Sequence, residues 1–158
     1  MFKKILVPLD GSPLSQRALE PALVVGQQTG AQLLLVRMPV VESLNFSVSE
    51  HRHAEARNDA LVYLETIRKS NEQPGLHIQT QISEGSEAAA RSGVVIKSEV
   101  RIGSPAEVIL EHVETYDTDL IVMATHGRTG LKRWVYGSVT AKVLRSVNCS
   151  MLVTLRAD

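Results

Sequence analysis

Short apolar runs alternate with amphipathic stretches along most of the chain. Four of the runs are apolar at nearly every position, which is typical of strands buried on both faces of a sheet. They cover residues 5–9, 33–36, 120–123 and 151–155. Between them, apolar residues recur at a helical period over residues 13–29, 50–70, 105–115 and 138–146. This alternation predicts an α/β fold, an open parallel sheet with helices on both faces.

Glycine, proline and serine mark where these elements begin and end. The first strand runs into Asp10-Gly11-Ser12-Pro13, which predicts a turn and a helix with Ser12 as N-cap and Pro13 at the first position. Gly30 is expected to close that helix. Ser104 is expected to cap the 105–115 helix, and residues 39–50 are expected to be a loop.

A fifth strand is indicated by an internal echo. The segment HIQTQISEGSEA (77–88) aligns with VIKSEVRIGSPA (95–106). Chance similarity and a local duplication both explain the echo. We expect the in-sheet strand in the second copy, because that copy leads into the 105–115 helix. The chain is therefore expected to be a single domain over residues 1–158, with an insertion or duplication around 76–93.

Composition narrows the classes of function. The chain has 158 residues, 17 Lys plus Arg and 17 Asp plus Glu, so no global field favours nucleic acid or a membrane surface. No run approaches the roughly 20 apolar residues of a membrane span. The single Cys149 excludes an internal disulfide framework and a multi-cysteine metal site. Because no signal peptide is visible at the N-terminus, we expect a cytoplasmic protein.

The stretch after the 120–123 strand, ATHGRTGLKRWVYGSVT (124–140), is unusually rich in glycine and basic residues. Glycine permits close approach of backbone N–H groups to an anion, and the helix that begins at Gly137-Ser138 favours an anion at its N-terminus. Ser138 and Thr140 add hydroxyls, and His126 and Arg128 add positive charge. Two readings remain open, a phosphate site and an ordinary glycine loop with Ser138 as a plain N-cap.

Asp10 supports the interpretation of this stretch as a phosphate site. Ligands of open parallel sheets bind beyond the carboxyl ends of the strands, so Asp10 faces the 124–138 block if the first and fourth strands are adjacent. A carboxylate is a poor neighbour for phosphate but a good acceptor for ribose hydroxyls. The combination favours a nucleotide.

Other chemistry has weaker support. His51 and His53 lie on different faces of a helix, which does not make a metal pair. The chain lacks a Walker phosphate loop, the dinucleotide fingerprint and the Gly-x-Ser-x-Gly elbow. We therefore assign no catalytic residue and no protein metal ligand.

The 124–138 block resembles the signature of the nucleotide-binding branch of the universal stress protein family, Gly-x2-Gly-x9-Gly-(Ser/Thr). Gly127, Gly137 and Ser138 match it, and Ala124 replaces the first glycine. KKILVPLDGS (3–12) resembles the family's first strand with its aspartate. Apart from the echo, the similarity extends over nearly the whole chain.

This resemblance implies a sheet of five parallel strands in the order 3-2-1-4-5, the adenine nucleotide alpha hydrolase-like fold. It implies ATP or AMP as ligand, with a nucleotide-bound Mg²⁺. It also implies a homodimer through the last strand, Met151 to Leu155. The family often has His where this chain has Arg37.

The resemblance also implies site residues. Asp10 would meet ribose or adenine with Leu9 beside it, and Met38 would line the adenine pocket. Ala124 and Gly127 would lie against ribose and phosphate. The phosphates would be cradled by Gly137, Ser138 and Val139.

Three functions follow from these expectations. The first is a stress-associated regulatory protein that binds ATP or AMP between the first and fourth strands. The second is a dimeric interaction module of the same family that binds no nucleotide. The third is a slow ATPase, for which His126 is the only candidate base.

Overall fold

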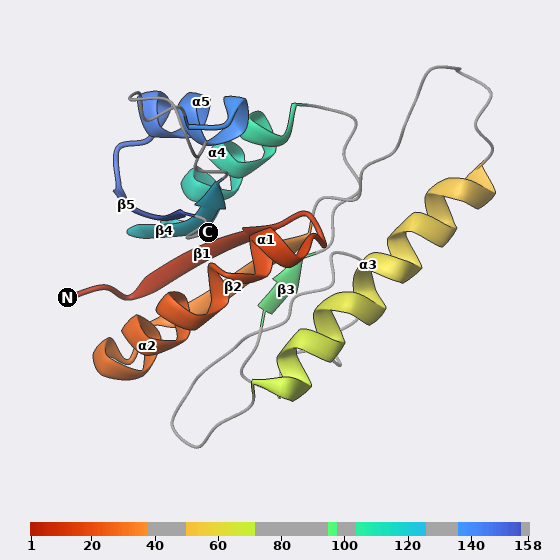
Figure 1. The fold of residues 1–158 in the computed structure, drawn as a ribbon, viewed down its shortest axis with the longest axis horizontal. Coiled ribbons are helices and arrows are strands. Elements are labelled where there is room, and N and C mark those ends of the chain that lie inside the picture. Colours follow the sequence, from red (N-terminus) through yellow and green to blue (C-terminus); the bar gives the residue numbers. More distant parts are fainter. Residues whose placement is uncertain (38–49, 72–94, 98–103, 126–135, 156–158) are drawn as a thin grey trace.

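The computed structural model of the chain describes residues 1–37, 50–71, 95–97, 104–125 and 136–155. Five strands form one sheet in the order β3-β2-β1-β4-β5, and every neighbouring pair is parallel. The strands are β1 Lys4–Leu9, β2 Gln32–Arg37, β3 Val95–Lys97, β4 Leu120–Thr125 and β5 Ser150–Leu155 (Figure 1). The predicted parallel sheet and the strand order implied by the family resemblance are both confirmed.

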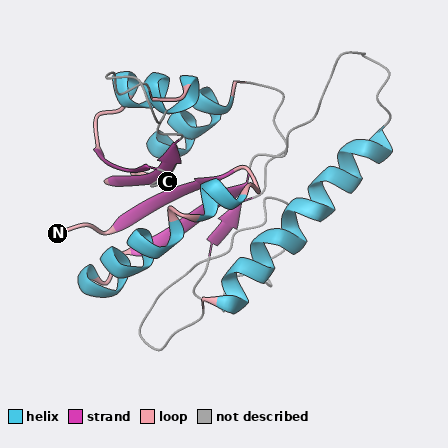
Figure 2. Cartoon of the chain, in the orientation of Figure 1, coloured by secondary structure: helices cyan, strands magenta, loops and turns pink. Residues whose placement is uncertain are grey.

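The described residues also form five helices, drawn in cyan in Figure 2. They are α1 Pro13–Gln16, α2 Leu19–Thr29, α3 Glu50–Ser70, α4 Pro105–Tyr116 and α5 Ser138–Ser146. The helices cover both faces, because the strands supply side chains to two separate buried clusters. This is the expected consequence of strands whose central positions form continuous apolar runs.

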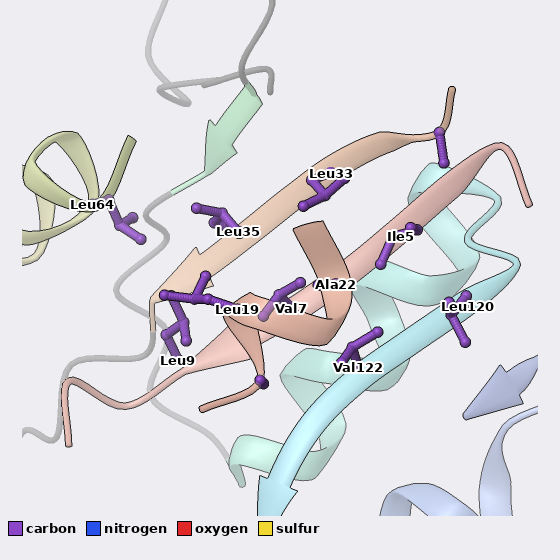
Figure 3. Close-up of a cluster of buried hydrophobic side chains, with 12 residues drawn as sticks. Ile5, Val7, Leu9, Leu19, Ala22, Leu33, Leu35, Leu64, Leu120 and Val122 are labelled. Atoms are coloured by element: carbon purple, nitrogen blue, oxygen red, sulfur yellow. The ribbon is translucent and has the colours of Figure 1, made fainter. Parts of the chain in front are cut away.

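One cluster joins β1, β2 and β4 to α2 and α3 (Figure 3). Ile5, Val7 and Leu9 of β1 all point to this face, where Leu19 of α2 and Leu64 of α3 pack. Leu64 is fully buried, so α3 is held to the sheet by an apolar anchor rather than by its helical propensity alone.

The second cluster lies on the opposite face. It contains Leu6 of β1, Ile121 of β4, Ile109 of α4 and Val143 of α5. The strands thus send alternate side chains to opposite faces, as the pleat requires. The two helices at the carboxyl half of the chain, α4 and α5, therefore lie on one side of the sheet, and α2 and α3 on the other.

The helix predicted over residues 13–29 is in fact two helices. The chain leaves α1 after Gln16 and begins α2 at Leu19, with Arg17 N donating to Leu14 O at 3.1 Å across the break. Pro21 explains the break, because proline has no N–H and its ring clashes with the carbonyl four residues earlier, that of Arg17. In α2 this proline occupies the first turn, where its missing N–H costs nothing.

The predicted helix boundaries are otherwise confirmed. The Ser12 hydroxyl accepts from Ser15 N at 3.1 Å, and Gly30 ends α2 with a φ of 69°. Ser104 is the N-cap of α4, although its side chain makes no capping hydrogen bond there; its carbonyl accepts from Glu107 N at 2.9 Å.

The internal echo is only partly within the described residues. β3 lies in the second copy, where the in-sheet strand was expected, and pairs with β2. The proposed insertion at 76–93 and the 39–49 segment lie outside the described residues. No helix in the described part of the chain is both long enough and apolar enough to cross a membrane.

Candidate functional site

The first and fourth strands are neighbours at the centre of the sheet. The chain leaves β1 for β2 on one side, and it leaves β4 for β5 on the other, so the strand order reverses between β1 and β4. β1 and β2 pair over six residues, whereas β1 and β4 pair at two, Ile5 with Leu120 and Leu6 with Ile121. The ladder that joins β1 to β4 is thus confined to their amino-terminal halves. Ligands of open α/β sheets bind at such a reversal, beyond the carboxyl ends of the strands.

A rigid turn follows β1. The Asp10 carboxylate accepts from Ser12 N through Oδ1 at 2.8 Å, and Asp10 N donates to the Ser15 hydroxyl at 3.4 Å. The Ser15 hydroxyl in turn donates to Ser12 O at 2.9 Å. Gly11 completes the turn with a φ of +86°, a conformation that L side chains rarely adopt. The carboxylate is therefore held at the strand end while remaining exposed.

Hydrogen bonds to its side chain tune the acidity of Asp10. Partial burial by itself would raise the pKa of this carboxyl, but hydrogen bonds from Ser12 and Ser15 outweigh burial and hold the pKa below its usual value. Asp10 is consequently a carboxylate at neutral pH and can accept hydrogen bonds from hydroxyl groups.

The end of β4 is tied to the start of α5. Thr125, the last residue of β4, is 3% exposed, and its hydroxyl accepts from Gly137 N at 3.0 Å. Gly137 is the N-cap of α5. This hydrogen bond fixes the N-terminus of α5 against the carboxyl end of β4, on the face opposite α2.

The N-terminus of α5 presents backbone donors. The N–H groups of Ser138, Val139 and Thr140 have no intrahelical acceptors, because the helical ladder begins with Ala141 N and Gly137 O at 2.8 Å. Ser138 is exposed, whereas Thr140 is 3% exposed and lies on the buried face of the helix with Val143. An anion at this end would be met by free N–H groups and the positive end of the helix dipole.

Ala124 fits its place without backbone strain. It lies within β4, and Asp117 is the only described non-glycine residue with a positive φ. Its methyl packs against the cluster on the α2 and α3 face. The methyl group and the α5 N-terminus are thus on different faces of the sheet.

The predicted site residues fall into two groups. The structure brings seven of them to the carboxyl ends of the two central strands and to the start of α5: Leu9, Asp10, Ala124, Gly137, Ser138, Val139 and Thr140. The other four, Met38, His126, Gly127 and Arg128, lie outside the described residues. The Gly137 N–H does not take part in the expected phosphate cradle, because it already donates to the Thr125 hydroxyl.

Sequence reasoning missed Thr125 and Ser15, and it noted Arg37 only as a departure from the histidine that the family often has. A hydroxyl at the last position of an apolar strand, directly before a glycine-rich loop, is the signal that marks Thr125. A charged residue that ends the apolar run Leu33–Val36 is the signal that marks Arg37. Within the described residues, no cluster of three or more His, Cys, Asp or Glu side chains is arranged to hold a metal ion.

Comparison with known proteins agrees with this architecture. Universal stress protein YxiE of Bacillus subtilis is 31% identical over 160 residues, covering 97% of this chain and 99% of its own. The solved structure of MJ0577, a universal stress protein of Methanocaldococcus jannaschii, aligns with a TM-score of 0.70 at 27% identity, covering 100% and 99% of the two chains.

The fold is also similar to that of an Arabidopsis thaliana member of the universal stress protein family, solved with AMP bound. The two structures align with a TM-score of 0.56 at 19% identity, covering 98% of this chain and 92% of the other. The model of the universal stress protein family matches residues 1–154. The chain therefore belongs to the universal stress protein family.

Proposed function

We propose that this protein binds an adenine nucleotide, ATP or AMP, at the carboxyl ends of β1 and β4, and that occupancy regulates its contacts with other proteins. In this proposal the α5 N-terminus holds the phosphates and Asp10 accepts from the ribose hydroxyls. Mg²⁺ enters as the counter-ion of ATP. A role in the stress response and a cytoplasmic location complete the proposal.

The observation that carries the proposal is the pairing of two unlike groups at one strand reversal. An ionised carboxylate held by Ser12 N follows β1, and a helix N-terminus whose first N–H groups have no acceptor within the helix follows β4. A nucleotide carries both matching parts, hydroxyls at the ribose and anionic oxygens at the phosphate. A simple anion would match the helix but be repelled by the carboxylate.

The relatives support the same ligand class. The Arabidopsis thaliana universal stress protein of this fold was crystallised with AMP bound. Gly137-Ser138 also match the family signature, in which Ala124 replaces the first glycine, and Asp10 lies in the segment that resembles the family's first strand.

Isothermal titration calorimetry with AMP, and with ATP plus Mg²⁺, tests the proposal. We expect saturable binding that is weakened about tenfold or more by Asp10→Asn, because an amide is a poorer acceptor for two ribose hydroxyls than a carboxylate. The matched control is Asp59→Asn, at an exposed position on α3, which should leave the affinity unchanged. Absence of binding in the wild-type protein would contradict the proposal.

A dimeric interaction module is the second candidate. β5 is one of the two edge strands of the sheet, and it carries Leu152 and Leu155, each 37% exposed. An apolar edge strand is a ready surface for pairing with another chain. We propose that β5 pairs with its counterpart in a second copy.

Light scattering coupled to gel filtration measures this directly. The dimer predicts a mass twice the 17.3 kDa of the chain, and Leu152→Glu should lower it towards the monomer. Leu144→Glu, on α5 and 44% exposed, is the matched control. A wild-type monomer at all concentrations would refute the dimer.

A further inference from the structure

A salt bridge joins α4 to α5 near the helix N-terminus that is proposed to hold phosphate. Lys142 Nζ donates to Glu107 Oε1 at 2.7 Å, and the two side chains are 45% and 63% exposed. Glu107 lies in the first turn of α4, and Lys142 follows Ser138, the first residue of α5, by four positions. The two helices lie side by side on one face of the sheet (Figure 1), so the pair lies between their amino-terminal halves.

The pair is on the side of α5 that faces the strand reversal. α4 covers β1 and β4, because Ile109 belongs to the buried cluster that contains Leu6 of β1 and Ile121 of β4. Since Lys142 extends from α5 towards α4, its ammonium lies on the β1 side of α5, away from the outer edge that β5 forms. The proposed nucleotide occupies the same side.

The position of Lys142 is unusual for α5 taken alone. Cations stabilise the carboxyl-terminal turn of a helix, where Arg145 lies, and are disfavoured near the positive end of the helix dipole. Helical side chains lean towards the N-terminus, so the long side chain of Lys142 extends over the turn that contains Ser138 and Val139. The ammonium is therefore held beside the N–H groups that have no acceptor within the helix.

The contact with Glu107 is easily exchanged. The hydrogen bond and the charge of Lys142 hold the pKa of Glu107 below its usual value, so both groups are charged at neutral pH. An ion pair this exposed contributes little to stability, because water competes for both groups. A phosphate at the α5 N-terminus would offer the ammonium a charge-assisted hydrogen bond, while the helix dipole holds the same phosphate.

We propose that Lys142 distinguishes ATP and ADP from AMP, by leaving Glu107 and donating to a phosphate beyond the first. The inference rests on the proposed function. The single phosphate of AMP is met by the N–H groups of Ser138 and Val139 and leaves the salt bridge closed. Each further phosphate lengthens the anion, and Lys142 is the cation of α5 that is nearer in sequence to its N-terminus. Binding of ATP or ADP therefore opens the salt bridge between α4 and α5.

Isothermal titration calorimetry with AMP and with ATP, at one Mg²⁺ concentration, tests the assignment. We expect ATP to bind the wild-type protein about tenfold tighter than AMP. Lys142→Met should lower this ratio of affinities about fivefold, the size of one exposed charge-assisted hydrogen bond. The affinity for AMP itself should change by less than about twofold, because AMP leaves the salt bridge closed.

The partner of Lys142 gives the sharper test. Glu107→Gln removes the same salt bridge but leaves the ammonium available to phosphate, so the ratio should rise about twofold or more. A purely structural role predicts that both substitutions act in the same direction, because each breaks the same link between α4 and α5. The matched controls are Arg145→Met and Glu114→Gln, exposed charges in the last turns of α5 and α4, which should leave the ratio unchanged.

The outcomes separate this assignment from the proposed function. Opposite changes in the ratio for Lys142→Met and Glu107→Gln, with both controls unchanged, support the assignment. Equal affinity of the wild type for ATP and AMP would overturn it and leave nucleotide binding intact, as would changes in the same direction or an Arg145→Met effect as large as that of Lys142→Met. If the wild type binds neither nucleotide, the proposed function fails and the role of Lys142 fails with it.

Discussion

The hydrogen bond between Thr125 and Gly137 makes a testable link between β4 and α5. Thr125→Val keeps the shape of the side chain but removes the acceptor for Gly137 N, which lies 3.0 Å away in the wild type. A typical hydrogen bond contributes about 1 kcal/mol, and a buried donor left without a partner costs up to about 3 kcal/mol. Because this donor is only partly buried, we expect a loss of about 1–2 kcal/mol.

Two measurements check this value. Urea denaturation should show the lower free energy of unfolding, and the melting temperature should fall by roughly 3–6 °C for a domain of this size. Amide hydrogen exchange should show faster exchange at Gly137 in Thr125→Val, since the opening free energy of that amide depends on the bond.

Controls separate the hydrogen bond from packing. Thr125→Ser keeps the hydroxyl and loses only a methyl group, so the Gly137 amide should remain protected even where stability falls. Thr66→Val, at an exposed position on α3, should change stability by less than about 0.5 kcal/mol. Unchanged exchange at Gly137 in Thr125→Val would refute the assigned role of Thr125.

Further substitutions probe the core, the turn after β1 and the carboxylate, each followed by urea denaturation. Leu64→Ala removes a fully buried side chain and should cost about 2–5 kcal/mol, whereas Val62→Ala, 59% exposed, should cost less than about 0.5 kcal/mol; equal losses would contradict the packing of α3. Gly11→Ala should cost at least about 1 kcal/mol, because alanine is strained at a φ of +86° and its methyl would displace the Arg37 guanidinium; a neutral effect would contradict that geometry. The lowered pKa of Asp10 means that its ionised form stabilises the fold above its unfolded pKa of about 3.9, and this contribution is lost as pH falls through the folded pKa. The stability advantage of the wild type over Asp10→Asn should therefore be present at pH 6 and shrink towards pH 3. A difference in stability that stays constant with pH would contradict the assignment.

The strands were the most predictable part of the fold. Leu33 to Val36 and Leu120 to Met123 are apolar at every position, and only a strand covered on both faces uses such a run. The order of the strands is another matter, because each buried run looks the same and none specifies its neighbours. That order came from the family resemblance.

The details of the site depend on contacts between distant residues. Asp10, Gly137 and Ser138 could be selected because turn and helix-start residues follow apolar runs. The acceptor role of Thr125 could not, since it requires the chain to return to the same strand end twelve residues later. The packing of Arg37 on Tyr63 likewise requires knowing which face of the sheet α3 covers. The break at Pro21 was visible in the sequence, but the helical period on both sides of it concealed the interruption.

The most direct test of nucleotide binding between β1 and β4 is a titration of ¹⁵N-labelled protein with AMP, followed by two-dimensional NMR of the backbone amides. Binding at the proposed place predicts saturating shifts at Ser138 and Val139 and at the turn formed by Asp10, Gly11 and Ser12. Unshifted amides at both of these segments, with shifts confined to the outer faces of α2 and α3 or absent altogether, would contradict the account.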